Sequence, residues 1–302
     1  TVKRIRFLES ALLESGQGVA DEEKNIFHVE KFSPQVCFLY LALFGALKAI
    51  LSSFRTSNPT WIKRPQLASE KVDVSGTCLM DIVSRRLDAM VRSRCEAEYW
   101  NSDSLTKVRW GSSTNIPLGP SSVDFVLTSP PYCTRIDYAS NTQVELATLG
   151  ITGDSYTNLR RSLMGTTTVP SVAPEVDQRW GPECIAFLEK LYAHPSRASQ
   201  VYYFKNHLQY FASLFASIRE LGRVVKAKGR ACLVIQDSYY KDVHNTLPLM
   251  CEQMAEQVGF LVASRWDFSS RGNKSKINKK SKVYRSHFKL NEAVIILERT
   301  NT

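Results

Sequence analysis

The sequence predicts an α/β protein built on a largely parallel sheet with helices on both faces. From residue 107 onward, short apolar segments alternate with longer segments of helical periodicity, as is typical of such sheets. Two of the predicted strands, 122–127 and 230–235, run directly into polar and aromatic residues. Because ligands of α/β sheets bind at the carboxyl ends of strands, we expect both strand ends to lie at one functional edge.

Residues 1–100 are predicted to form a mostly helical N-terminal region. Apolar residues recur at helical spacing in 8–13, 36–54 and 80–91. Prolines, small polar residues and three cations interrupt the pattern between Arg55 and Pro65. This break is interpreted as a linker rather than as a ligand contact.

Residues 101–302 are predicted to form the α/β core. A helix over 210–225 is expected to end before Lys228-Gly229, and a helix over 247–258 before Gly259, because glycine commonly follows a helix. The remaining strong patterns are strand-like. The expected strands are 107–110, 122–127, 230–235, 261–266 and 290–297.

Two stretches of the core do not fit this alternation. Residues 133–205 form a long insertion after the second predicted strand, and long insertions near a strand end are usually functional. Residues 271–289 carry eight Lys and Arg residues and no acid. We call them the basic loop. It is predicted to contact phosphates, or else to be a solvated hairpin tip.

The strand Val123–Leu127 leads into Thr128-Ser129-Pro130-Pro131-Tyr132, which we call the bracket. Neither proline has an N–H and each fixes its own φ, so the backbone is rigid and its carbonyls face outward as acceptors. The Ser129 hydroxyl and the Pro130 carbonyl can each accept a hydrogen from the exocyclic amine of a nucleobase. Stacking of the base on Tyr132 contributes about 1–3 kcal/mol. The simpler alternative is a turn that only ends a strand.

The bracket and its strand resemble the catalytic motif of the S-adenosylmethionine-dependent amino-methyltransferases of DNA. In that family Ser, Asn or Asp precedes Pro-Pro and an aromatic residue, and a leading Ser is commoner in cytosine-N4 than in adenine-N6 enzymes. The correspondence runs from about Lys107 to Glu298. It implies a Rossmann-like methyltransferase sheet with an antiparallel last strand, S-adenosylmethionine as cofactor, DNA with a flipped target base, and no covalent intermediate.

The resemblance also implies roles for individual residues. The expected catalytic residues are Ser129, Pro130, Pro131 and Tyr132. The expected cofactor contacts are Thr128, Ser112 and Gly111. The expected DNA contacts are Arg135, Tyr138, Lys274, Lys276, Lys279, Lys280, Lys282 and Arg285. A structural pair between Arg135 and Asp137 is an open alternative. Asp237, Tyr239 and Tyr240 are expected at the rim of the site.

One part of the family pattern is missing. The glycine-rich loop that holds the methionine end of the cofactor is not found, because the only Gly-x-Gly, Gly16-Gln17-Gly18, follows a helical pattern. The loop could lie on a partner polypeptide or upstream, or be divergent; alternatively, the chain is a degenerate relative.

We therefore predict a DNA amino-methyltransferase core or subunit of the restriction-modification type that forms N4-methylcytosine. A second methyltransferase subunit or a homodimer is a possible partner. The alternatives are a non-catalytic DNA-binding module and an adenine-N6 or RNA methyltransferase.

Composition is consistent with a polyanionic partner. Lys and Arg outnumber Asp and Glu by 39 to 29, a formal net charge of +10. The seven cysteines form no C-x-x-C pair and the histidines share no metal-ligand spacing, so reduced thiols and no metal site are expected. No apolar stretch reaches the length of a membrane span. We expect a cytoplasmic, DNA-associated protein.

Overall fold

The computed structural model describes residues 2–15, 32–54, 56, 63, 65–95, 106–133, 136–270 and 290–301. The chain folds as two compact units. The first, which we call the helical unit, comprises Thr1–Val108 and Tyr138–Arg160; the second, the sheet unit, comprises Arg109–Asp137 and Arg161–Thr302. Among the described helices, none combines the length and the hydropathy needed to cross a membrane.

The helical unit joins the N-terminal helices to part of the long insertion. Its helices are α1 (Val2–Ser15), α2 (Pro34–Ile50), α3 (Gly76–Cys95), α4 (Tyr138–Asn141), α5 (Gln143–Thr148) and most of α6 (Gly153–Ser162). Ser33 caps α2 by accepting a hydrogen bond from Val36 N. Lys48 of α2 forms an ion pair with Glu145 of α5. Residues 138–160 therefore group with the N-terminal helices, whereas 161–205 belong to the sheet unit.

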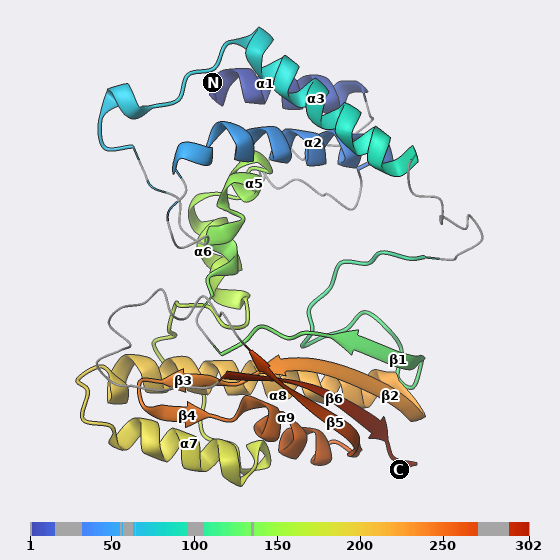
Figure 1. Cartoon of the computed structure of the whole chain (residues 1–302), viewed down its shortest axis with the longest axis vertical. Helices are drawn as coiled ribbons and strands as arrows, with labels where there is room; N and C mark the ends of the chain where they lie inside the picture. Colours follow the sequence, from blue (N-terminus) through green and yellow to red (C-terminus); the bar gives the residue numbers. More distant parts are fainter. Residues whose placement is uncertain are drawn as a thin grey trace. The chain divides into compact units, whose positions relative to one another are not determined.

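The sheet unit is a mixed α/β structure with helices around a mixed sheet, compatible with a Rossmann-like methyltransferase fold (Figure 1). Its strands are β1 (Val123–Thr128), β2 (Val225–Gln236), β5 (Phe260–Ser270) and β6 (Leu290–Arg299), in the order β1-β2-β6-β5. Among these described strands, β1 and β2 pair parallel, whereas β6 pairs antiparallel with both β2 and β5. The prediction of a largely parallel sheet is wrong for the described strands, because the last strand inserts between β2 and β5. The predicted antiparallel last strand is confirmed.

The core of this unit lies between one face of the sheet and three helices: α7 (Pro182–Ala193), α8 (Phe204–Val224) and α9 (Leu247–Glu256). Residues at alternate positions of β2 and β6 are almost fully buried there, as the two-residue period of a strand requires. These residues are Ala231, Leu233, Ile235, Ala293, Ile295 and Leu297. A small hairpin of β3 (Ser238–Tyr240) and β4 (Val243–Asn245) follows β2, and the π turn Ser199–Tyr203 precedes α8.

The opposite face of the sheet, which we call the open face, also carries apolar side chains. Cross-strand pairing places Leu127 beside Cys232, Cys232 beside Ile296, and Val294 beside Trp266. Phe125 and Leu127 are 55% and 68% exposed, and Trp266 and Phe268 are also exposed. We use "open face" for this set: Phe125, Leu127, Cys232, Val234, Trp266, Phe268, Val294 and Ile296.

Two predicted boundaries are wrong. The stretch Lys107–Trp110 is not a strand: no described strand pairs with it, and Val108 and Trp110 are 94% and 91% exposed. The helix over 210–225 begins earlier, at Phe204, and Lys228-Gly229 lies within β2 rather than before it. Lys228 has φ +62°, and the β1–β2 register shifts here, so this dipeptide forms an irregularity in the strand.

Candidate active site

The bracket leaves the sheet at the carboxyl end of β1, where Thr128 still pairs with Leu233 of β2. Immediately after it, the exposed Ser129 donates its hydroxyl hydrogen to the Val234 carbonyl oxygen at 3.0 Å. A serine hydroxyl has one donor and two acceptor lone pairs. Because the donor is occupied by Val234, the Ser129 oxygen can act only as an acceptor toward a ligand in this geometry.

Hydrogen bonds distinguish the two proline carbonyls. Tyr210 of α8 donates its hydroxyl hydrogen to the Pro131 carbonyl at 2.6 Å. Among the described residues, no hydrogen bond reaches the Pro130 carbonyl. No donor in the described part of the chain therefore reaches the Ser129 hydroxyl oxygen or the Pro130 carbonyl, the two acceptors that the sequence predicts for a donor-bearing ligand.

The Tyr132 ring is tethered to the last strand. Its hydroxyl donates to Glu292 Oε1 at 2.6 Å. Glu292 lies on β6 opposite Gln236 of β2 and opposite Phe268 of β5. A hydrogen bond to a charged acceptor is shorter and stronger than one between neutral groups. The contact therefore restricts the orientation of the ring beside the bracket.

The second predicted polar strand end lies next to the first. Because β1 and β2 are adjacent and parallel, their carboxyl ends share one edge, and Ser238 Oγ donates to the Cys133 carbonyl at 3.2 Å. Asp237 is buried: its Oδ1 accepts from Asn291 N at 2.9 Å, and its Oδ2 lies 2.8 Å from His244 Nε2. The structure thus brings the two strand ends together.

Burial keeps the cysteine that follows the bracket protonated. It raises the pKa of the Cys133 thiol to about 12. Since the thiolate is the nucleophilic form of cysteine, this thiol is not suited to covalent catalysis at neutral pH.

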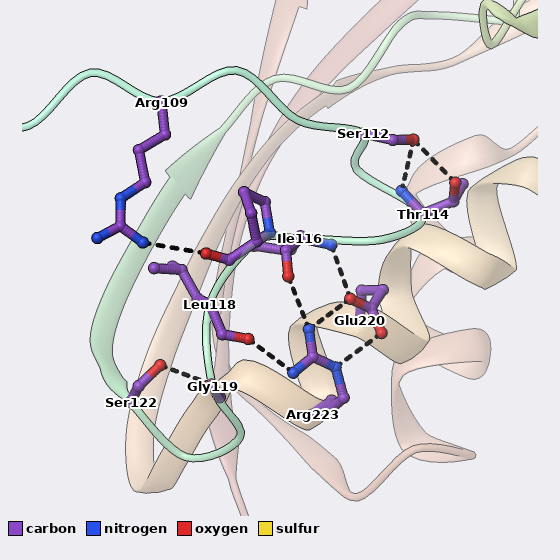
Figure 2. A network of polar contacts seen from close by, with 10 residues as sticks. Arg109, Ser112, Thr114, Ile116, Leu118, Gly119, Ser122, Glu220 and Arg223 are labelled. Carbon is purple, nitrogen blue, oxygen red and sulfur yellow. Dashed lines mark hydrogen bonds and ion pairs between the residues drawn. The ribbon is translucent and has the colours of Figure 1, made fainter.

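The turn that precedes β1 is fixed by an ion pair on α8 (Figure 2). Glu220 accepts a hydrogen bond from Ile116 N at 2.8 Å, while Arg223 donates to the Ile116 and Leu118 carbonyls at 2.9 and 2.8 Å. The two side chains also bond to each other, at 2.7 Å. The Arg223 guanidinium holds the pKa of the Glu220 carboxyl below its usual value. This network sets the position from which β1 starts.

The expected cofactor residues Gly111 and Ser112 lie in this turn. Ser112 Oγ bonds Thr114 Oγ1 at 2.9 Å and accepts from Thr114 N, as Figure 2 shows. A Cβ on Gly111 would lie 2.6 Å from Pro117 Cδ, so packing against that proline already accounts for a glycine here. None of the described contacts of these two residues involves the bracket.

Most of the expected DNA contacts cannot be placed. Arg135 and the basic-loop residues Lys274, Lys276, Lys279, Lys280, Lys282 and Arg285 lie outside the described residues. Tyr138 begins α4 in the helical unit, where it is partly exposed and where burial raises its pKa. Asp137 is buried and accepts a hydrogen bond from Thr167 Oγ1 at 3.2 Å.

Sequence reasoning missed Glu292, Tyr210 and His244 as neighbours of the site. Glu292 meets Tyr132 only because β6 inserts beside β2, a pairing between residues 160 positions apart. The available signal was a single acid, next to Asn291, in the otherwise apolar strand Leu290–Leu297. Tyr210 and His244 carried no comparable signal.

Comparison with known proteins finds a partial likeness. No family model and no solved structure matches the chain. Two curated proteins do match, each named Type II methyltransferase M.AvaI, from Nostoc sp. (strain PCC 7120 / SAG 25.82 / UTEX 2576) and from Anabaena variabilis. Each is 26% identical over 154 residues, which cover 46% of this chain. The match spans about 31% of the length of either relative. This likeness supports a relationship to the DNA methyltransferases.

Proposed function

We propose that this chain is the base-binding and catalytic part of an S-adenosylmethionine-dependent DNA amino-methyltransferase, with cytosine N4 as the target. The observation that carries the proposal is the Ser129 hydrogen bond to the Val234 carbonyl. It leaves the Ser129 oxygen as an acceptor beside the Pro130 carbonyl, at the strand edge where α/β sheets bind ligands. The likeness to the M.AvaI methyltransferases supports the reaction class.

In this mechanism the bracket prepares an exocyclic amine for attack. The base is flipped out of the duplex, because its amine is out of reach inside the stack. Ser129 Oγ and the Pro130 carbonyl each accept one amine hydrogen and so hold the nitrogen lone pair out of conjugation with the ring. Tyr132 stacks on the base, and Glu292 fixes the orientation of that ring. Transfer is direct, because the amine nitrogen is itself the nucleophile and loses its proton after it has attacked the methyl group.

S-adenosylmethionine supplies the methyl group in this class of reaction, but Gly111, Ser112 and Gly76 do not form the glycine-rich loop expected to hold it. The Cβ position of Gly111 is filled by Pro117, and Ser112 bonds within its own turn. The sequence Asp73-Val74-Ser75-Gly76 is an incomplete match to the glycine-rich loop, but Gly76 begins α3 instead of following a strand, and Asp73 pairs with Arg4. These described positions therefore do not supply the glycine-rich loop, and Thr128 at the end of β1 stays the proposed contact with the cofactor.

DNA binding is proposed to combine the bracket with electrostatic attraction. The net charge of +10 and the basic loop 271–289 favour phosphate contact. Such binding weakens steeply as salt concentration rises. The expected contacts Arg135 and Tyr138 remain part of this proposal.

A methyl-transfer assay tests the assignment. The chain, alone and with any co-encoded subunit, is given labelled S-adenosylmethionine and duplex DNA, and the product is digested to nucleosides. Ser129→Ala removes one of the two amine acceptors and is expected to lower transfer about 10²-fold, the order seen when reacting groups are misplaced. Ser122→Ala, which loses only a bond to the Gly119 carbonyl, is the matched control. Equal rates for Ser129→Ala and the unaltered chain would sink the proposal.

The cofactor misfit favours one second candidate, a methyltransferase-derived module that binds DNA without catalysis. Calorimetry separates the two functions. Retained DNA affinity, with no affinity for S-adenosylmethionine in the intact complex, would favour the module. N6-methyladenine or a methylated ribonucleoside in the digest would instead move the substrate to adenine or RNA.

A further inference from the structure

Two exposed aromatic side chains lie on the open face of the sheet. Trp266 and Phe268 of β5 are 52% and 55% exposed. Because they are two residues apart on one strand, they point to the same face and lie about 6.8 Å apart along it. Neither is part of the buried core that the described residues of this unit form. Exposed apolar patches mark interaction sites, so these rings indicate a binding surface.

Strand pairing connects these rings to the aromatic ring of the bracket. Phe268 lies directly opposite Glu292 of β6, and Glu292 accepts the hydrogen bond from the Tyr132 hydroxyl at 2.6 Å. Side chains directly opposite each other in an antiparallel pair have Cβ atoms about 4.5–5.5 Å apart. The Tyr132 hydroxyl, Phe268 and Trp266 therefore follow one another across the open face.

The charges on and beside this face suit an anionic partner. Of the acids on this side of the sheet, Glu298 is ion-paired with Arg230, and Glu292 is bonded to the Tyr132 hydroxyl. β5 ends at Ser270, and the basic loop 271–289, with eight Lys and Arg residues and no acid, follows directly in the sequence. Cations next to exposed aromatic rings are the combination with which proteins bind single-stranded nucleic acid.

Four-stranded sheets can bind such strands through aromatic side chains on an uncovered face, on which two or three bases stack. We propose that the open face binds single-stranded DNA, whose unpaired bases stack on Trp266 and Phe268 beside the base held by the bracket. The inference rests on the proposed function in assigning this strand to the DNA that carries the target base. A closed duplex does not fit the surface, because the faces of its bases are covered by neighbouring base pairs.

Binding of a labelled oligothymidylate of about 20 nucleotides tests the proposal. Thymine has no exocyclic amine, so the bracket cannot hold it as a methylation target, and S-adenosylmethionine is left out. Trp266→Ala and Phe268→Ala should each raise the dissociation constant about 5-fold to 150-fold, the range of base stacking. Trp266→Phe, which keeps a ring, should raise it by no more than about threefold. Trp110→Ala is the matched control, because Trp110 is 91% exposed in the same unit but lies outside the open face.

Two further measurements distinguish stacking from electrostatic attraction. In Trp266→Ala the affinity for a fully paired duplex of the same length should change less than about twofold, because paired bases offer no free face. The slope of log affinity against log salt concentration should be the same as in the unaltered chain, because it reports the number of phosphate contacts. Equal losses for single strand and duplex, or for Trp266→Ala and Trp110→Ala, would overturn the proposal.

Oxidative footprinting of the purified chain tests whether the face is uncovered. Trp266 should be oxidised at least about tenfold faster than Trp180, which is 2% exposed, because a buried ring is reached only through local opening. Oxidation of Trp266 as slow as that of Trp180 would show that another part of the chain covers the face. A dimer that Trp266→Ala dissociates, measured by light scattering, would assign the face to a second copy. Either result overturns the proposal.

The outcomes separate this proposal from the proposed function. Oligothymidylate binding that depends on Trp266, together with no methyl transfer to any base, supports the stacking surface and sinks the proposed function. Methyl transfer that depends on Ser129, together with oligothymidylate binding that is unchanged in Trp266→Ala, sinks the stacking surface alone.

Discussion

Replacing Tyr132 by Phe removes one hydrogen bond of the site and leaves the stacking surface unchanged. The hydroxyl donates to Glu292 Oε1 at 2.6 Å, and both side chains are partly buried. Hydrogen bonds to charged groups contribute about 1.5–3 kcal/mol. Because the site is partly solvated, the lower end applies, so Tyr132→Phe should lower the free energy of unfolding by about 1.5 kcal/mol. The corresponding fall in melting temperature is about 3–6 °C.

A double-mutant cycle with Glu292→Ala isolates this interaction, because residues in contact have non-additive effects. The melting temperature and the urea midpoint are measured for Tyr132→Phe, Glu292→Ala and the double variant. We expect a coupling free energy of about 1 kcal/mol or more. Tyr192→Phe, an exposed tyrosine on α7, is the control for loss of a hydroxyl. Additive effects of the two changes would refute the tether between β6 and the bracket.

Two substitutions of Tyr132 distinguish the role of its hydroxyl bond to Glu292 from the role of its ring in stacking on the base. Under the proposed function, Tyr132→Phe retains its ring and should change methyl transfer by no more than about threefold. Tyr132→Ala loses base stacking of about 1–3 kcal/mol, which corresponds to a fall of about 5-fold to 150-fold. A Phe variant as inactive as the Ala variant would contradict stacking as the role of this ring.

Three further predictions test the surroundings of the site. Gly111→Ala places a Cβ 2.6 Å from Pro117 Cδ and should lower the free energy of unfolding by about 1–3 kcal/mol, measured in urea. An unchanged urea midpoint would show that the turn shifts to accommodate the Cβ. Arg223 lowers the folded-state pKa of Glu220 below its ordinary 4.5, so this stabilisation is present above pH 4.5 and is lost as pH falls through the lower folded value. The Glu220→Gln variant should therefore lose less unfolding free energy than the unaltered chain as pH falls below 4.5. An equal decrease in unfolding free energy for the two proteins would contradict this prediction. At pH 8, iodoacetamide should alkylate Cys133 at least tenfold more slowly than the exposed Cys37 and Cys78, because burial raises the pKa of Cys133 to about 12; equal rates by mass spectrometry would contradict the raised pKa.

The parts of the site that depend on neighbours in sequence could be predicted from sequence. The strand before Thr128 shows as an apolar run of β-branched and aromatic residues, and Pro130 and Pro131 limit their own φ wherever they occur. The helical spacing that identifies α8 and α9 is equally local. The sequence also predicted that Asp237 follows directly after a strand. Because β1 and β2 are parallel neighbours, their carboxyl ends lie at the same edge of the sheet.

Only the tertiary structure decided which distant residues meet. The insertion of β6 between β2 and β5 makes the sheet mixed and brings Glu292 to Tyr132. The predicted strand at Lys107–Trp110 fails for the same reason, because a strand needs a partner and none lies beside it among the described residues. Strand pairing is a hydrogen-bonded contact between segments far apart in the chain. The sequence alone therefore predicted the bracket and its acceptors, and the sheet order determined which distant residues lie beside them.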